Sequence, residues 1–202
     1  MSEHPSKTKL IDAAIDLVRT KGYAATRVDE VCAAAGVTKG SFFHHFATKE
    51  DLGLAAAQAW RDRAAGLFAG LTPDSHPDPL DRLLAYLDLR RAMISDDLVE
   101  WSCYGGTMIQ ELHQTQPALR DACQQGMDDH AAVLAPMIQA ALTRHRVAAA
   151  WTADSLARHI LAVIQGAIIL AKGAGQADAA RDCIDHLRRY VEQIFDHRGA
   201  TS

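Results

Sequence analysis

Basic and small polar residues gather in one short stretch near the start of the chain. Between Val37 and Lys49 the sequence holds two Lys, two His, two Thr and one Ser but no acidic residue. Ammonium, imidazole and hydroxyl groups are donors that bind phosphate oxygens. Gly40 removes a side chain where a helix would have to approach a nucleic-acid backbone. The stretch therefore predicts a local surface that binds DNA.

The net charge of the whole chain is negative, so a DNA-binding surface has to be local. Residues 1–52 carry seven Lys or Arg and seven Asp or Glu, a net charge of zero. Residues 53–202 carry fourteen Lys or Arg and eighteen Asp or Glu, and so hold the whole net charge of −4. The charge balance thus points to the first 52 residues as the DNA-binding part.

Two helices are expected before the basic stretch. An apolar face at helical spacing, starting at Leu10, predicts a first helix that Ser6 caps and Gly22 ends. Thr26 and Asp29 have the spacing of a capping box, so Thr26 is expected to open the second helix.

A sharp turn and a third helix follow. Gly36 is expected to end the second helix, and Val37 to pin the turn against the core. Thr38 can cap a third helix that reaches about Phe46. Three short helices, the last two joined by a tight turn, are typical of a helix-turn-helix unit.

The rest of the chain also has helical periodicity. Thr48 and Asp51 form another capping box, which predicts a connector helix over about 49–71, and the Pro-rich segment 72–79 interrupts the pattern. Further helices are predicted from Leu80, from Thr107, from Pro117 with a bend at Pro136, from Thr152 to about Ala174, and from Asp178 to about His197. The prediction is an all-α fold with an N-terminal three-helix helix-turn-helix DNA-binding domain in 1–52 and a larger helical ligand-binding and dimerisation domain in 73–202.

Cysteine spacing and hydropathy set the expected compartment. No CxxC motif and no His at metal spacing accompanies the four cysteines, Cys32, Cys103, Cys123 and Cys183. The first residues lack an apolar signal region, and the longest apolar run, Ile160 to Ala171, predicts a buried helix. We therefore expect a cytoplasmic protein that contacts no membrane and uses neither a metal nor a cofactor.

The segment from Thr26 to Leu52 resembles the DNA-binding region of the TetR family of bacterial repressors. The family pattern is an apolar-Ala pair, Ala-Gly-Val-Ser/Thr, x-Gly-x-Leu/Phe-Tyr-x-His-Phe, and Lys-Glu-x-Leu. The corresponding residues here are Val31-Cys32, Ala35-Gly36-Val37-Thr38, Gly40-Ser41-Phe42-Phe43-His44-His45-Phe46 and Lys49-Glu50-Asp51-Leu52. The length of 202 residues and the all-helical remainder also fit the family.

This resemblance implies roles for individual residues. Lys39, Ser41 and His44 are expected to read base edges in the major groove. Phosphate contacts are implied for Thr38, Phe43, His45 and Lys49, and the predicted DNA-binding set also includes Thr26, Arg27 and Gly40. Phe43 stands where the family usually has Tyr, so a packing or sugar contact replaces the hydroxyl contact with phosphate.

A homodimer on a palindromic operator is implied as well, because two recognition helices must lie about one DNA turn apart. In the family the last two helices pair with those of the second subunit. The helix around Ile160 is apolar nearly all round, which fits either this interface or a helix central to one protomer. The predicted interface residues are Ile160, Ile164, Ala167, Ile168, Ala171, Leu187, Val191 and Ile194.

The stretches Glu100–His113 and Pro117–Arg120 resemble a TetR subgroup with a Cys, a Gly, an apolar-Gln-Glu motif and Pro-x-Leu/Phe-Arg. Some members sense electrophiles or oxidants through that Cys, so Cys103 is a candidate thiol switch. A structural thiol and a passive pocket residue are the alternatives, since nearby acidic residues oppose the thiolate. Aromatic and Met side chains suit an unknown apolar or aromatic small-molecule effector in a pocket of Trp101, Cys103, Tyr104, Met108, Met127, His130 and Gln165.

The same sequence leaves two other classes of protein as alternatives. No Ser-x-x-Lys, Gly-x-Ser-x-Gly, HExxH or phosphate-loop motif is present, so a helical enzyme is only a remote alternative and no catalytic residue is assigned. A TetR-like activator or coregulator is the nearer alternative. The sequence favours a transcriptional repressor that binds double-stranded operator DNA and is released by a small molecule or by thiol modification.

Overall fold

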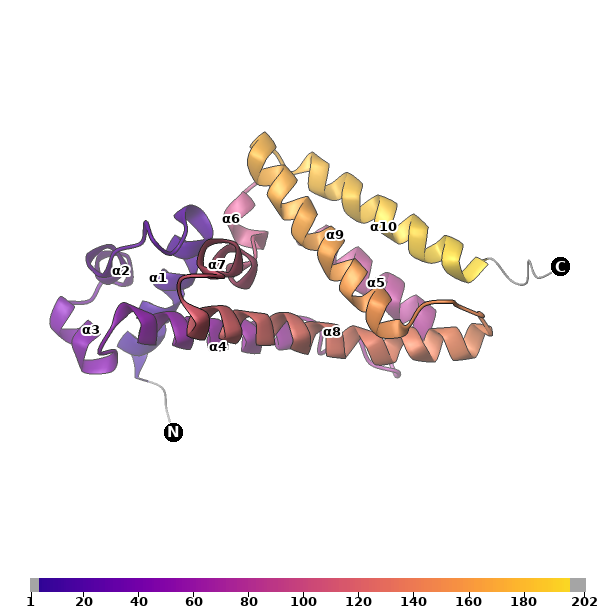
Figure 1. Cartoon of the computed structure of the whole chain (residues 1–202), viewed down its shortest axis with the longest axis horizontal. Coiled ribbons are helices and arrows are strands. Elements are labelled where there is room, and N and C mark those ends of the chain that lie inside the picture. Colours follow the sequence, from indigo (N-terminus) through magenta and orange to yellow (C-terminus); the bar gives the residue numbers. More distant parts are fainter. Residues whose placement is uncertain (1–3, 197–202) are drawn as a thin grey trace. The chain divides into compact units, whose positions relative to one another are not determined.

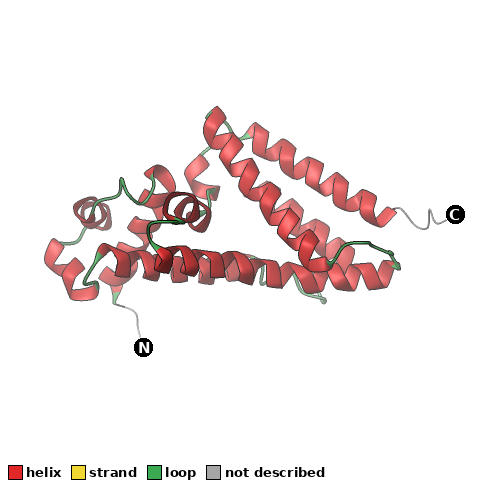
Figure 2. Ribbon diagram, viewed as in Figure 1, coloured by secondary structure: helices red, strands yellow, loops and turns green. Residues whose placement is uncertain are grey.

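The computed structural model describes residues 4–196, and all regular structure within them is α-helical (Figures 1 and 2). The helices are α1 (Pro5–Lys21), α2 (Val28–Ala35), α3 (Lys39–His45), α4 (Lys49–Leu67), α5 (Pro79–Ala92), α6 (Leu98–Trp101), α7 (Tyr104–Leu112), α8 (Pro117–His145), α9 (Ala153–Ala174) and α10 (Asp178–Asp196). The predicted all-α class is confirmed, with three helices before the connector helix, the first of them 17 residues long.

The described residues form two compact units. The first comprises those up to Ala64 together with Ser102–Met127, and the second comprises Ala65–Trp101 together with those from Asp128 on. Helices α4 and α8 each run from one unit into the other without interruption. The predicted domain bounds, 1–52 and 73–202, stay a prediction, but the packing groups residues 102–127 with the N-terminal helices instead of with the rest of the second segment.

The core of the first unit is built by α1, α2, α3 and α7, which Figure 1 shows grouped together. Helix α1 contacts each of the other three. Phe42 from α3, Leu10 from α1 and Met108 from α7 are fully buried in one apolar cluster. The three helices of the helix-turn-helix unit are therefore held by an apolar core to which α7 contributes Tyr104, Met108 and Leu112.

The first two helices begin differently from the predictions. Helix α1 begins at Pro5, which suits a first helical position because it has no N–H to satisfy, and no side chain caps it. The prediction that Ser6 caps this helix was therefore wrong. Helix α2 begins at Val28, where the Glu30 carboxylate accepts a hydrogen bond from the Arg27 backbone N–H at 2.9 Å. The predicted capping box of Thr26 was also wrong.

Helix α7 begins three residues before the predicted start at Thr107. Its N-cap is Cys103, whose Sγ accepts a hydrogen bond from the Gly106 backbone N–H at 3.3 Å. The Gly105-Gly106 pair lies inside the helix and is buried, so it brings α7 close to its neighbours rather than breaking it. The other capping predictions, at Thr38, Thr48 and Thr152, are confirmed by side-chain hydrogen bonds.

The bounds of the other helices agree with the predictions in part. Helix α4 stops at Leu67, before the predicted end at 71, and α6 is a short helix that the periodicity did not show. The predicted end of the last helix at about His197 lies outside the described residues. Pro117 begins α8 as predicted, and Pro136 lies within that helix.

The second unit is built on contacts of α10 with α9 and α5, and of α6 with α9. Among the described helices, α9 is the one that is long and apolar enough, by length and composition, to cross a membrane. One side of it is nevertheless buried inside the protein, including Leu156, Ile160, Ile164 and Ile168. Helix α9 is therefore a core helix of the second unit.

Candidate nucleic-acid interface

The turn between α2 and α3 has the geometry that the sequence predicts. Gly36 has φ +64° and ψ 35°, a left-handed conformation that glycine adopts at low cost. The Thr38 hydroxyl accepts a hydrogen bond from the Ser41 backbone N–H at 3.1 Å, which fixes the first turn of α3. Phe42 is fully buried and anchors the helix from its inner side. The outer side of α3 is thus held in a defined orientation.

This outer side carries the predicted base-reading residues. Lys39 and His44 are exposed and Ser41 is half-buried, while Phe43 has 55% of its side chain exposed. The Lys39 ammonium lies 2.8 Å from the Asp29 carboxylate on α2. DNA has to compete with this ion pair, which is exposed to solvent and easily exchanged. These residues lie together on one accessible surface, and their DNA contacts stay a prediction.

His45 joins α3 to α1. Its Nε2 forms a hydrogen bond of 2.7 Å with the Ser6 hydroxyl, and its ring lies 5.2 Å from that of His4. Burial lowers the pKa of His45, and the neighbouring His44, His4 and Lys7 lower it further. His45 therefore helps to hold α3 against α1. The Ser6 hydroxyl serves as its hydrogen-bond partner and does not cap α1 as predicted.

Lys49 and Thr26 form hydrogen bonds within the turn between α1 and α2. The Lys49 Nζ donates a hydrogen bond of 2.6 Å to the Tyr23 carbonyl and lies 4.0 Å above the Tyr23 ring. Burial lowers the pKa of Lys49. Thr26 is buried, and its hydroxyl donates to the Gly22 carbonyl at 2.7 Å. These polar groups stabilise the turn between α1 and α2, while the phosphate contact of Lys49 and the inclusion of Thr26 in the DNA-binding set stay predictions. Arg27 and Gly40 remain exposed.

A residue that the sequence analysis did not assign holds this same turn. The Glu111 carboxylate, on α7, accepts hydrogen bonds of 2.6 Å from the backbone N–H groups of Tyr23 and Ala24. Gly22 allows this close approach, because a Cβ there would lie 2.8 Å from a Glu111 carboxylate oxygen. The apolar-Gln-Glu motif was the available signal, but nothing in the sequence joins it to a turn 88 residues away.

The opposite end of α7 carries Cys103. This residue is half-buried, and its Sγ accepts the Gly106 N–H at the N-terminus of the helix. Arg19 is close by, and its Nε donates to the Ser102 carbonyl at 2.8 Å. Burial lowers the pKa of Arg19, and the nearby Asp16 and Cys103 partly offset this effect. Helix α7 thus links a thiol at one end with the turn before α2 at the other.

The predicted effector residues are divided between the two units. Tyr104 and Met108 are buried in the core of the first unit. Cys103 and Met127 belong to the same unit but not to that core. His130, Gln165 and Trp101 belong to the second unit. Tyr104 and Met108 are core residues, and the Tyr104 hydroxyl donates to the Gly53 carbonyl at 3.1 Å.

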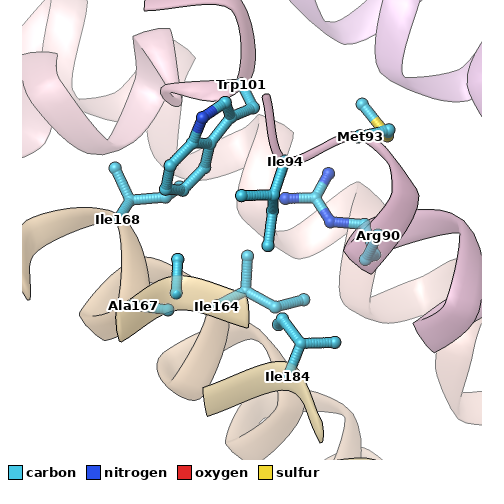
Figure 3. Close-up of a pocket in the computed structure, with 9 residues that line it drawn as sticks. Arg90, Met93, Ile94, Trp101, Ile164, Ala167, Ile168 and Ile184 are labelled. Atoms are coloured by element: carbon cyan, nitrogen blue, oxygen red, sulfur yellow. The ribbon is translucent and has the colours of Figure 1, made fainter. Parts of the chain in front are cut away.

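A pocket is present within the second unit, and of the predicted effector residues it includes only Trp101 (Figure 3). The pocket is small, with room for about one water molecule, and it is partly open to solvent. The walls include Ile94, Trp101, Ile164, Ile168, Ile184 and Arg90. Arg90 is one of several arginines on α5, and nothing in the sequence distinguishes it from the others.

The predicted dimer residues are almost all interior residues of one protomer. Every one except Ile194 is buried within the chain, so α9 is central to the protomer, the alternative that the sequence left open. The outward side of α9 is apolar too, with Ile169 49% and Leu170 58% exposed. Gly166 and Gly173, on the same side, have open space around them. The predicted interface residues therefore need correction.

Comparison with known proteins identifies the family. Residues 10–56 match the family described as bacterial regulatory proteins, tetR family. Residues 79–187, more than half of the chain, match the tetracyclin repressor-like C-terminal domain. Together the two matches span both the helix-turn-helix unit and most of the remaining helices.

Individual relatives agree with this assignment. The transcriptional regulator AcuR of Cereibacter sphaeroides is 29% identical over 163 residues, which are 81% of this chain and 74% of AcuR. The HTH-type transcriptional repressor DhaR of Mycobacterium sp. is 28% identical over 120 residues, which are 59% of each chain. The crystal structure of a regulatory protein TetR from Rhodobacter sphaeroides superposes with a TM-score of 0.82 at 27% identity, covering 93% of this chain and 99% of the other. The chain is therefore a member of the TetR family of bacterial transcriptional regulators, which are DNA-binding proteins and not enzymes.

Proposed function

We propose that this protein is a cytoplasmic repressor that binds a palindromic operator as a homodimer and is released by a small-molecule effector or by thiol modification. The observation that carries the proposal is the exposed side of α3, where Lys39, Ser41 and His44 lie on a helix fixed from its inner side by Phe42. Similarity to a protein named a repressor supports repression over activation.

The outward sides of α9 and α10 are the proposed dimer surface. Ile169 and Leu170 are exposed on α9, and Tyr190 is 44% exposed on α10. The Tyr190 ring lies 5.4 Å from that of His159 on α9, so the two outward sides are adjacent. Gly166 offers a place where helices can approach closely. Exposed apolar groups of this kind are typical of a protein–protein contact.

Replacing Leu170 with Asp is expected to dissociate the dimer. The substitution puts two charges, one from each subunit, into an apolar contact, and we expect the dimer dissociation constant to rise about 100-fold or more. Sedimentation equilibrium measures this constant directly. The matched control is Val133→Asp on α8, because Val133 is 50% exposed and lies outside the proposed surface. Equal effects of the two variants would refute this surface.

Release is proposed to pass through α7. Modification of Cys103 disturbs the bond of its sulfur with the Gly106 N–H and adds bulk at the start of the helix. At its other end, the Glu111 carboxylate holds the backbone of Tyr23 and Ala24. Both contacts lie in the unit that contains the recognition helix, so a displacement of α7 acts on α2 and α3 through the turn before α2.

Operator binding with and without a thiol reagent tests both parts of the proposal. Fluorescence anisotropy with DNA that flanks the gene, against a random duplex, is expected to show competitor-resistant binding that N-ethylmaleimide weakens at least about tenfold. The Cys103→Ser variant is expected to bind the operator and to resist the reagent. Burial raises the pKa of Cys123 to about 12 and also raises that of Cys32, so these two thiols should react slowly.

Cys183, half-buried on α10, provides the control for this experiment. If Cys183→Ser, and not Cys103→Ser, protects operator binding, then the reagent acts on α10 and the role of Cys103 is refuted. If the reagent has no effect on wild-type protein, thiol release is refuted and a reversible effector remains. A transcript that falls when the gene is deleted would indicate activation in place of repression.

A further inference from the structure

Three imidazole rings and one ammonium group lie together where the start of α1 meets the end of α3. The His45 ring, on α3, lies 5.2 Å from the ring of His4, the residue before α1, and 4.9 Å from the ring of His44. The charge of Lys7, in the first turn of α1, acts on His45 as well. Each of these residues is exposed or half-buried, so solvent reaches all of them. These four residues form the histidine cluster.

One hydroxyl joins two of the rings. The Ser6 Oγ lies 2.7 Å from the His45 Nε2 and 3.1 Å from the His4 Nδ1. A hydroxyl has one hydrogen, so Ser6 donates to one ring and accepts from the other while both rings are neutral. If a proton is added to the ring that accepts, both rings donate to Ser6, and the hydroxyl hydrogen is released to another acceptor. Protonation thus makes the bridging hydroxyl a donor to an outside oxygen.

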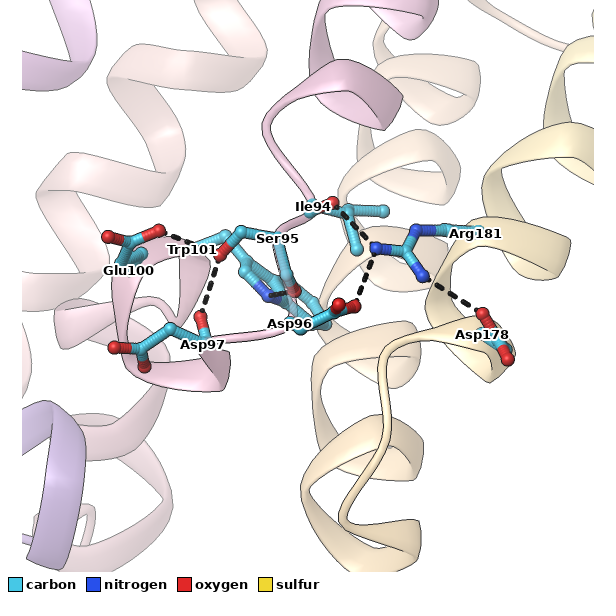
Figure 4. A network of polar contacts seen from close by, with 8 residues as sticks. All are labelled: Ile94, Ser95, Asp96, Asp97, Glu100, Trp101, Asp178 and Arg181. Atoms are coloured by element: carbon cyan, nitrogen blue, oxygen red, sulfur yellow. Dashed lines mark hydrogen bonds and ion pairs between the residues drawn. The ribbon is translucent and has the colours of Figure 1, made fainter.

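No carboxylate among residues 4–196 forms an ion pair with the cluster. The titratable groups that act on His45 are the other three members of the cluster, from α3 and from α1, and all three are basic. Basic side chains elsewhere are paired: Arg181 in the second unit, for example, bonds to Asp96 and to Asp178 at 2.9 Å each (Figure 4). The cluster therefore lacks an internal partner for its positive charge.

The charged form of His45 is disfavoured in the free protein. Burial lowers the pKa of His45, and the charges of His44, His4 and Lys7 lower it further. An anion beside the cluster acts in the opposite direction, because it stabilises the imidazolium. Anion binding should therefore raise this pKa and take up a proton. The affinity for the anion then rises as the pH falls, and it levels off below the pKa of the free protein.

We propose that the histidine cluster is a binding site for phosphates of the DNA backbone that takes up protons when DNA binds. Backbone phosphates are the anions expected here, because the cluster includes the end of the helix whose outer side is predicted to enter the major groove. The protonated rings and Lys7 compensate the phosphate charge, and the Ser6 hydroxyl donates to a phosphate oxygen. The inference rests on the proposed function, to which it adds residues from α1 and a dependence on pH.

DNA affinity as a function of pH tests the site. Fluorescence anisotropy of the full chain, at constant ionic strength, should show that DNA flanking the gene binds at least about tenfold more tightly at pH 6 than at pH 8. The same gain is expected with a random duplex, because both duplexes carry the same phosphates. Calorimetry of the binding in two buffers of different ionisation enthalpy should show net uptake of protons.

Substitutions in the cluster distinguish a phosphate site from a purely structural contact. The variant with both His4→Gln and His45→Gln keeps polar side chains that cannot be protonated, and it should lose most of the gain between pH 8 and pH 6. His4→Gln alone, at an exposed position before α1, should lose part of it and remain folded. His186→Gln is the matched control, since His186 is an exposed histidine of α10, and should keep the whole gain.

A DNA affinity of wild-type protein that does not change with pH would overturn the proposal. A double variant that binds more weakly but keeps the whole gain would also overturn it, because the two histidines would then be structural only. A gain confined to operator DNA would indicate base reading and would contradict a phosphate site. Absence of binding to any duplex at either pH would refute the proposed function and the site with it, whereas operator binding without pH dependence refutes only the site.

Discussion

The Gly22→Ala variant is expected to be less stable than wild type by about 2–4 kcal/mol. Gly22 has φ +86° and ψ 165°, a conformation that costs other residues roughly 1–3 kcal/mol. The new Cβ would also displace the Glu111 carboxylate, which lies 2.8 Å from that position. Thermal unfolding followed by circular dichroism should show a melting temperature lower by roughly 5–15 °C.

A second glycine separates the two causes. Gly36 also has a positive φ, +64°, but no atom lies within 4 Å of a Cβ built on it. Gly36→Ala should therefore cost only about 1 kcal/mol. In a Glu111→Ala background the additional cost of Gly22→Ala should shrink, because the clash is gone. If Gly22→Ala costs as much in the Glu111→Ala background as in wild type, displacement of the Glu111 carboxylate contributes nothing to that cost.

The Lys39→Ala variant is expected to lose at least roughly 30-fold in operator affinity. Removing a base contact costs about 1–3 kcal/mol, and a dimer loses two of them. Asp29, which pairs with Lys39 at 2.8 Å in the free protein, would then face the DNA uncompensated. Anisotropy at fixed salt measures the affinity for operator and for random duplex. A base-reading role predicts that the ratio of the two affinities falls, whereas a phosphate role predicts a parallel loss.

Two further variants test whether the loss of affinity is specific to Lys39. Asp29→Asn removes the carboxylate that competes for Lys39 and should raise the affinity for both duplexes. Arg144→Ala removes one exposed positive charge from α8 and should leave the affinity nearly unchanged. An Arg144→Ala loss equal to that of Lys39→Ala would show that only the total charge matters, and would contradict a specific role for α3.

Local signals were the most reliable part of the sequence. Thr38, Thr48 and Thr152 each bond to a backbone N–H three residues ahead, so the few residues on each side determine the cap. Gly36 and Gly175 end their helices in left-handed conformations for equally local reasons. The family resemblance depended on the same short segment, which explains why class and fold were predicted correctly.

The sequence does not show which way a side chain points, toward the surface, toward the core or toward a second subunit. Lys49 has the residue type and place of a phosphate contact, yet its ammonium turns toward the Tyr23 carbonyl. Ile160 and Ile164 are apolar whether they face a second subunit or their own core, and the packing of α9 against α10 and α6 decides between the two. The contact of Glu111 with Tyr23 joins residues far apart in the chain and leaves no periodic trace. The sequence therefore predicts the recognition helix, but not the contacts from α7 and from the turn before α2 that hold it in place.

Helix α7 shares a core with the first three helices, and this limits how the DNA-binding residues can be transferred to another protein. A chimera that carries only residues 1–52 would leave the apolar surface that Tyr104, Met108 and Leu119 normally cover open to water. Protease cleavage at the border of the two compact units would have to cut α4 and α8 within their helices, since both cross it unbroken. We therefore expect DNA specificity to be exchanged between such regulators when only the outer residues of α3 are replaced. Replacing the first 52 residues as a block should fail.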